Sequence, residues 1–398
     1  MPAQRPLRIL IAVAATAALG ASVLPATSAP ANGATASALD RPRGAVLTSA
    51  PLTKRLWIPG TTRAAYKLTY VTSNTFGRKA LSTGTVFIPR GKAPAGGWPV
   101  ISWAHGTSGM GDACAPSVMG PAEPQRDWSY LSTWMKQGYA IVASDYAGLG
   151  TPGLHAYLDG KAAAHNIVDM VKAGRNFTAH LPASMHLSRR WVTIGQSQGG
   201  GAAIYTARWA TQYGGPGLDY RGAVGTGTPA YIEKLLLVLG PHVTPAAVLP
   251  TGMTAYLSYI LASLEFARPA LHLDGALTPL GRTWVAKART MCVVALENAI
   301  AGQNVGDWFT TPLAALPGFT STVDSYMAMP ESGFDKPFFM ANGLLDTDVP
   351  MPTTAAYVAV LTANQQPVTF KTYPTDHSGT LAASLADSVP FVAKLFGR

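Results

Sequence analysis

Residues 191–201 read Trp-Val-Thr-Ile-Gly-Gln-Ser-Gln-Gly-Gly-Gly, and this segment is the most informative part of the sequence. Its aromatic and β-branched start predicts a strand, and the small residues after it predict a helix. Gly-x-Ser-x-Gly between a strand and a helix is the pattern of a nucleophile elbow, a sharp turn that exposes the serine hydroxyl. Gly195 and Gly199 suit it because strand and helix cross closely there. We therefore predict that Ser197 is a nucleophile; the alternative is a glycine-rich turn.

A serine hydroxyl needs a base to take its proton and an acid to orient that base. His377 follows the last predicted strand, where the base of this architecture is expected. The acid precedes the base in the chain, and Asp346 comes first after an apolar strand. Asp348 and Asp376 remain alternatives for the acid, the first as a helix-capping or surface residue and the second as the immediate neighbour of His377.

An oxyanion needs two N–H donors, which this architecture takes from two separate turns. One donor is expected from Gln198, the residue after the nucleophile. The other is expected from Thr107, in the glycine-rich turn 105–109 that follows an apolar strand. The alternative for that turn is a tight loop with a structural His105.

Strands and helices alternate from about residue 98, which predicts a mostly parallel sheet with helices on both faces. The alternation stops over residues 229–334, which are apolar, helix-like and broken by prolines. We expect this segment to be a helical cap inserted into a core made of residues 45–228 and 335–398. Predicted helices in the cap and at the end of the chain include residues 231–239, 251–266, 282–301 and 380–396.

The amino terminus has the organisation of an export signal, with Arg5 and Arg8 before an apolar run over residues 9–24. The run is short for a membrane span, so a cleaved signal peptide is favoured over an anchor. We expect residues 1–36 to be signal and leader, the mature protein to be secreted, and no stable membrane span after cleavage.

Composition excludes several classes of protein. The net charge is +10, but the basic residues are scattered, whereas nucleic-acid binding usually requires a cluster. The chain has two cysteines, Cys114 and Cys292, which in an exported protein predict a disulfide; two free buried thiols are the alternative. Two thiolates are too few for a metal site formed by cysteines, and we expect neither a metal nor an organic cofactor.

With these motifs, the chain resembles the secretory lipase family of α/β-hydrolases. The resemblance rests on the elbow at 195–200, on Asp-Tyr-Ala-Gly-Leu-Gly at 145–150, on Gly-Leu-Leu-Asp-Thr-Asp-Val-Pro at 343–350, on the His377 loop and on the helical insertion. It implies the α/β-hydrolase fold, hydrolysis of acyl esters, Ser197, Asp346 and His377 as the triad, and a disulfide between the oxyanion loop and the cap.

These observations predict a secreted serine carboxylic-ester hydrolase, a lipase acting on triacylglycerol or other acyl esters through an acyl-enzyme. The expected partner is an acyl ester or lipid, at a lipid–water interface where one is present, and the expected state is a monomer. An acyltransferase or peptidase with the same triad is the first alternative. A non-catalytic binding protein on a hydrolase scaffold is the second.

Overall fold

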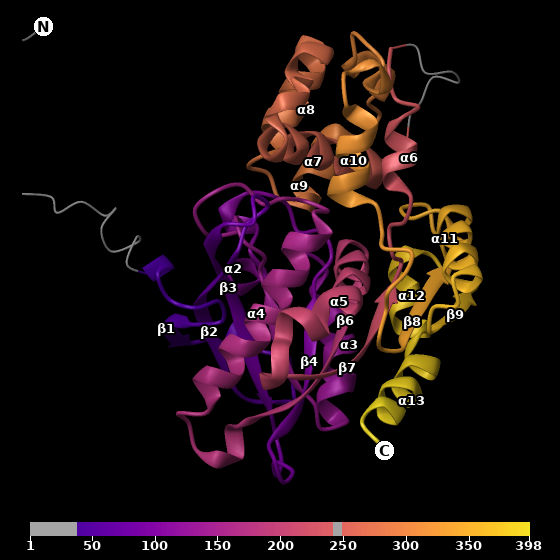
Figure 1. Ribbon diagram of the computed structural model, residues 1–398. Coiled ribbons are helices and arrows are strands. Elements are labelled where there is room, and N and C mark those ends of the chain that lie inside the picture. Colours follow the sequence, from indigo (N-terminus) through magenta and orange to yellow (C-terminus); the bar gives the residue numbers. More distant parts are fainter. Residues whose placement is uncertain (1–37, 242–248) are drawn as a thin grey trace, which may run out of the picture.

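The core of the molecule is a sheet of nine strands in the order β1-β2-β3-β5-β4-β6-β7-β8-β9 (Figure 1). The computed structural model describes residues 38–241 and 249–398, so the predicted signal peptide and leader lie outside the described residues. Strands β1 to β3 run antiparallel to their neighbours, and the six strands from β5 to β9 in sheet order are parallel. The strands are β1 Val46–Pro51, β2 Thr62–Ser73, β3 Lys79–Pro89, β4 Trp98–Ala104, β5 Ala140–Ser144, β6 Leu187–Gln196, β7 Asp219–Thr226, β8 Phe338–Gly343 and β9 Val368–Tyr373.

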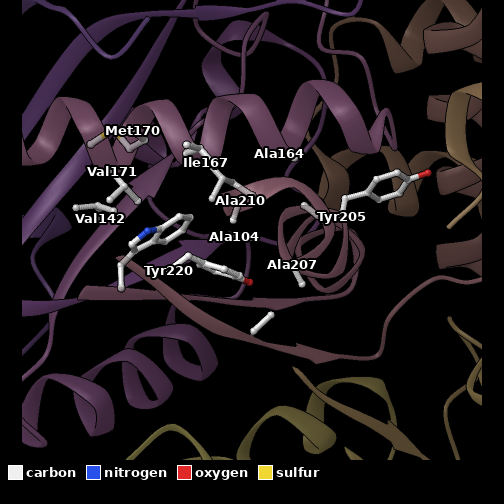
Figure 2. Close-up of a cluster of buried hydrophobic side chains, with 14 of the residues drawn as sticks. Ala104, Val142, Ala164, Ile167, Met170, Val171, Tyr205, Ala207, Ala210 and Tyr220 are labelled. Atoms are coloured by element: carbon white, nitrogen blue, oxygen red, sulfur yellow. The ribbon is translucent and has the colours of Figure 1, made fainter. Parts of the chain in front are cut away.

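Helices cover both faces of the sheet, as the alternating pattern predicts. One face packs against α4 (Gly160–Thr178), α5 (Gln198–Gly214) and α11 (Met351–Ala363). Figure 2 shows part of this layer, in which Ile167, Met170 and Val171 of α4 lie beside Val142 of β5. The other face packs against α3 (Pro124–Lys136), α12 (His377–Ala383) and α13 (Leu385–Leu395). Both layers are apolar, and their burial from water is the main term that holds the core together.

Between β7 and β8 the chain leaves the sheet and forms a separate group of helices above its carboxyl edge (Figure 1). This group, which we call the cap, contains α6 Ile232–Leu236, α7 Thr251–Ala267, α8 Pro279–Ala288, α9 Val293–Ile300 and α10 Phe319–Met327. Its side chains form their own apolar cluster, which Met110 and Tyr157 of the core join. Within the described ranges, no helix is both long enough and apolar enough to cross a bilayer.

Three predicted helices are wrong in their extent, and the one expected over residues 231–239 is only the five-residue α6. The single helix expected over residues 282–301 is two helices, α8 and α9, because Cys292 is held by a disulfide to Cys114 and the N–H of Val293 donates to the carbonyl of Ser108 at 3.0 Å. Those bonds to a distant segment replace the helical bonds that would continue α8. The helix expected over 380–396 also breaks, at Ser384, whose hydroxyl donates to the Leu381 carbonyl at 2.9 Å.

Candidate active site

Ser197 occupies the turn between β6 and α5 with a strained backbone. Its φ of 59° and ψ of −126° lie in a region of backbone angles that residues other than glycine rarely adopt. A methyl group at Gly195 would lie 2.0 Å from the carbonyl oxygen of Gly199, and one at Gly199 would lie 1.9 Å from that of Ala104. Both glycines are therefore required by close backbone contact, and they hold Ser197 at the carboxyl edge of the sheet.

The structure brings His377 to Asp346 and not to either alternative acid. Nδ1 of His377 and Oδ2 of Asp346 are 2.7 Å apart, and both residues are buried. The other carboxylate oxygen of Asp346 accepts the backbone N–H groups of Asp348 at 3.0 Å and Val349 at 2.8 Å. This loop geometry fixes the carboxylate toward the imidazole, and the hydrogen bond occupies Nδ1 of His377.

Asp376, the third candidate acid, has a structural role. Its carboxylate accepts the N–H of Gly379 at 2.7 Å and caps the amino end of α12. His377 is consequently the first residue of that helix rather than part of the preceding loop. Nε2 of His377 has no hydrogen-bond partner among the described residues, and His377 lines the same cavity as Ser197. Nε2 is therefore the ring nitrogen of His377 that the described residues leave unoccupied.

The two expected oxyanion residues are both held by side-chain contacts to one loop, residues 147–158. The hydroxyls of Thr107 and Tyr157 are 2.7 Å apart, and Nε2 of Gln198 lies 2.8 Å from Nε2 of His155. Burial, and then the charge of His105, lower the pKa of His155 to about 3, so its ring is neutral at neutral pH and Nε2 accepts from Gln198. His155 and Tyr157 are not predicted from the sequence, because a loop without periodicity gives no signal of what it contacts.

Two cavities of opposite character meet at Ser197. The apolar cavity has a volume of about 220 Å³ and is lined mainly by cap residues, among them Leu235, Leu236, Leu239, Met253, Leu257 and Ile260. The polar cavity has a volume of about 160 Å³, and its polar lining includes Glu123, Arg126, Gln196, Glu297, Asp348 and His377, beside the apolar side chains of Ala122, Val293 and Val294. Other large cap residues, including Tyr259, Trp284, Trp308 and Phe309, are buried in the cap's own cluster. Ser197 thus lies between a mainly apolar cavity and one with several charged groups, and Asp348 lines both.

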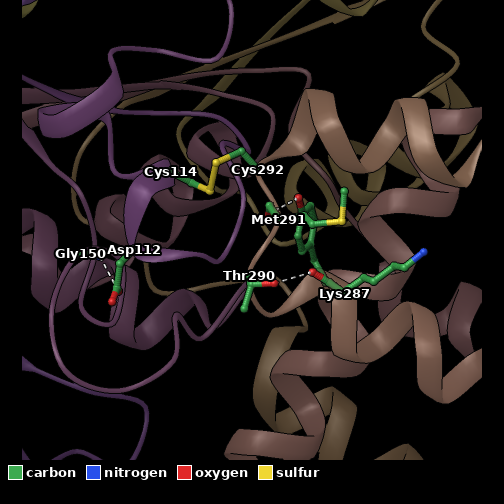
Figure 3. Close-up of a disulfide and its surroundings, with 8 residues drawn as sticks. Asp112, Cys114, Gly150, Lys287, Thr290, Met291 and Cys292 are labelled. Atoms are coloured by element: carbon green, nitrogen blue, oxygen red, sulfur yellow. Dashed lines mark hydrogen bonds between the residues drawn. A yellow bond between two sulfur atoms is a disulfide. The ribbon is translucent and has the colours of Figure 1, made fainter. Parts of the chain in front are cut away.

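A disulfide between Cys114 and Cys292 ties the cap to the loop that follows β4 (Figure 3). The segments on either side are also paired, because Gly109 and Cys292 form an isolated antiparallel bridge. The first turn of α9 therefore has a fixed position next to the segment that carries Thr107. Over the residues that the structure describes, no group of three or more His, Cys, Asp or Glu side chains is arranged to hold a metal ion.

Comparisons with known proteins agree with this geometry. The family model described as "Secretory lipase" matches residues 116–311, a range that contains Ser197 and ends before Asp346. No curated protein matches the sequence.

Several solved structures are similar over most of the chain. Candida antarctica lipase A in its closed state has 21% identity and a TM-score of 0.70, over 92% of this chain and 84% of that one. The rice cell wall degrading esterase LipA from Xanthomonas oryzae has 18% identity and a TM-score of 0.70, over 89% of this chain and 98% of that one. A putative hydrolase from Legionella pneumophila has 21% identity and a TM-score of 0.69, over 88% and 98%. The expected α/β-hydrolase fold is confirmed.

Proposed function

The chain belongs to the secretory lipase family of carboxylic ester hydrolases, and on this premise we propose that it is a serine esterase with Ser197, His377 and Asp346 as its triad. The observation that carries the proposal is the 2.7 Å contact between His377 and Asp346 beside a serine in a strained turn. These three residues come from the ends of three different parallel strands, so only the fold brings them together.

In the proposed mechanism, Nε2 of His377 takes the proton of the Ser197 hydroxyl as its oxygen attacks the ester carbonyl. The N–H groups of Gln198 and Thr107 stabilise the resulting oxyanion. His377 then gives its proton to the leaving alcohol oxygen, and the acyl group stays on Ser197. Water attacks this acyl-enzyme by the same steps in reverse order and releases the acid. Asp346 keeps the imidazole in the required tautomer and stabilises its charged form.

The acyl group is placed in the apolar cavity, whose lining of leucine, isoleucine and methionine suits an aliphatic chain. The similar structures include a lipase from Candida antarctica and a cell wall degrading esterase from Xanthomonas oryzae. The cap forms one wall of this cavity, so we assign it the role of a lid over the site. We also propose that the chain is exported through its amino-terminal signal, that it functions as a monomer and that it acts at a lipid–water interface.

Hydrolysis of nitrophenyl esters with acyl chains of increasing length tests the function. We expect activity in the wild type, its loss in Ser197→Ala, and a fall in kcat of about ten thousandfold in Asp346→Asn. Ser321→Ala, at an exposed serine on α10, is the matched control and should keep full activity. A folded wild-type protein that cleaves no ester, or an active Ser197→Ala variant, would contradict the proposal. Added acceptor alcohol and analysis of the products separate hydrolysis from acyl transfer.

A further inference from the structure

The polar cavity lies on the side of Ser197 from which the alcohol leaves. His377 must protonate the alcohol oxygen, and His377 lines the polar cavity but not the apolar one. The alcohol part of the ester is therefore placed among Glu123, Arg126, Glu297 and Asp348. This assignment rests on the proposed esterase function and extends it to the other half of the substrate.

Two carboxylates in this cavity have no cationic partner. Glu297 of α9 and Asp348 are both partly buried, and among the described residues neither lies within 4.0 Å of a lysine or arginine nitrogen. Asp348 accepts only a long contact of 3.4 Å from the Tyr256 hydroxyl. Burial raises the pKa of both carboxyls, and the charge of Asp348 raises that of Glu297 further. Partly buried carboxylates without a cationic partner are costly in the free protein, and their oxygens can accept hydrogen bonds from a ligand.

The arginine in the cavity does not compensate these charges. Nε of Arg126 donates to Asp127 at 2.8 Å, and its Nη1 donates to Glu123 and, at 3.0 Å, to the hydroxyl of Ser378. Arg126 is thus occupied by residues of α3 and α12. The remaining charge of the cavity is negative, which disfavours an alcohol that carries a phosphate or carboxylate.

The cavity also contains an unpartnered donor. Gln196 is only 1% exposed and lines the cavity, and its Nε2 has no hydrogen-bond partner within residues 38–241 and 249–398. A buried amide without a partner is rare in folded proteins and requires an explanation. A hydroxyl group can accept from this amide and donate to a carboxylate at the same time, whereas a quaternary ammonium satisfies only the carboxylates.

We propose that the polar cavity is an alcohol subsite for polyols, formed by Gln196, Glu297 and Asp348, which selects acyl esters with a free hydroxyl beside the ester oxygen. A monoacylglycerol is the simplest ester of this class. Its single acyl chain fills the apolar cavity, and its two free hydroxyls lie in the polar one. A triacylglycerol would place a second acyl chain among the carboxylates, which costs free energy because their hydration is lost without replacement.

The test compares kcat/KM for a monoacylglycerol with kcat/KM for the methyl ester of the same fatty acid. We expect the wild type to prefer the monoacylglycerol by about tenfold or more, the effect of one hydrogen bond to a charged group. Glu297→Met keeps the size of the side chain but removes its acceptors, and should reduce this ratio about tenfold. Glu265→Met is the matched control, since Glu265 lies in α7 and is paired with Arg289. It should leave the ratio unchanged.

Three results would overturn the inference. One is a wild-type ratio near unity, and another is an unchanged ratio in both Glu297→Met and Asp348→Asn. The third is a choline ester of the same acid that is cleaved faster than the monoacylglycerol, which would assign the cavity to a cation. In each case the methyl ester is still hydrolysed, so failure of the subsite is distinct from failure of the esterase function, in which no ester is cleaved. Circular dichroism of each variant establishes that it is folded.

Discussion

Gly227 offers a direct test of how closely the site is packed, because a single methyl group there would press on the catalytic base. The residue follows β7 with a φ of +52°, and its N–H donates to the Ala341 carbonyl at 2.8 Å. A methyl group at this position would lie 2.7 Å from Cε1 and 2.9 Å from Nδ1 of His377. It would also lie 3.5 Å from Oδ2 of Asp346. Gly227→Ala is therefore a change at the base without any change in the triad itself.

The expected size of the effect follows from these distances. Carbon atoms in favourable contact are about 3.5 Å apart, so the imidazole must move by about 0.8 Å to accept the methyl group. A misplacement of about 1 Å at a reacting group can cost about a hundredfold in rate. We expect kcat to fall by about that factor, with KM nearly unchanged because both cavities keep their lining. The positive φ adds a loss of about 1–2 kcal/mol in the free energy of unfolding.

Gly215→Ala separates the two effects. Gly215 has a φ of +62°, and a methyl group there would meet nothing within 4 Å. Both variants should lose similar stability in guanidinium unfolding, while only Gly227→Ala should lose turnover on a nitrophenyl ester. If Gly227→Ala keeps more than about a tenth of the wild-type kcat, or if Gly215→Ala loses as much, the packing argument is wrong.

Three further predictions concern stability and the oxyanion residues. Replacement of both Cys114 and Cys292 by alanine, which opens a loop of 178 residues, should lower the free energy of unfolding by about 5 kcal/mol at most; an unchanged guanidinium midpoint would contradict this. Burial raises the pKa of Glu233 above its ordinary value of 4.5, so the folded state holds this proton more tightly than the unfolded state and loses that stability as pH rises. Glu233→Gln should accordingly raise the melting temperature at pH 8 but not at pH 4. Equal shifts of the melting temperature at both pH values would show that the ionisation of Glu233 is not the cause. His155→Phe keeps an aromatic ring but loses the acceptor for Gln198, and should lower kcat about tenfold without changing KM; a matching rise in KM would indicate a binding role instead.

Much of the site could be predicted from local signals. The elbow around Ser197 is a contiguous motif, and the order of serine, acid and histidine along the chain limits the partners to a few residues. The sequence alone is weaker evidence for Asp346 over Asp348 than for Ser197 as the nucleophile. The choice depends on which of the two carboxylates the turn directs toward His377. In contrast, the alternation of strands and helices predicts the fold class, and the motifs predict the family. Both predictions are confirmed.

What the sequence did not predict depends on contacts between distant segments. The break between α8 and α9 results from bonds to residues near Cys114. The helical periodicity of the sequence gives no sign of these bonds. The polar cavity combines side chains from α3, β6, α9 and the loop after β8. The motifs in β6 and in the loop after β8 indicate a nucleophile and an acid, but they do not indicate which other segments lie beside them. The contact between Gln198 and His155 is likewise invisible until both are placed in space.

The disulfide has a consequence for how the site opens. Because Cys292 is bonded to Cys114 and Val293 is hydrogen-bonded to Ser108, the α9 side of the cap cannot separate from the core. The cap is thus joined to the core at three places, which are this seam and the two chain connections, from β7 to α6 and from α10 to β8. The exposed side chain of Val238, which follows α6, lines the apolar cavity. The seam therefore keeps the start of α9 beside the segment that carries Thr107.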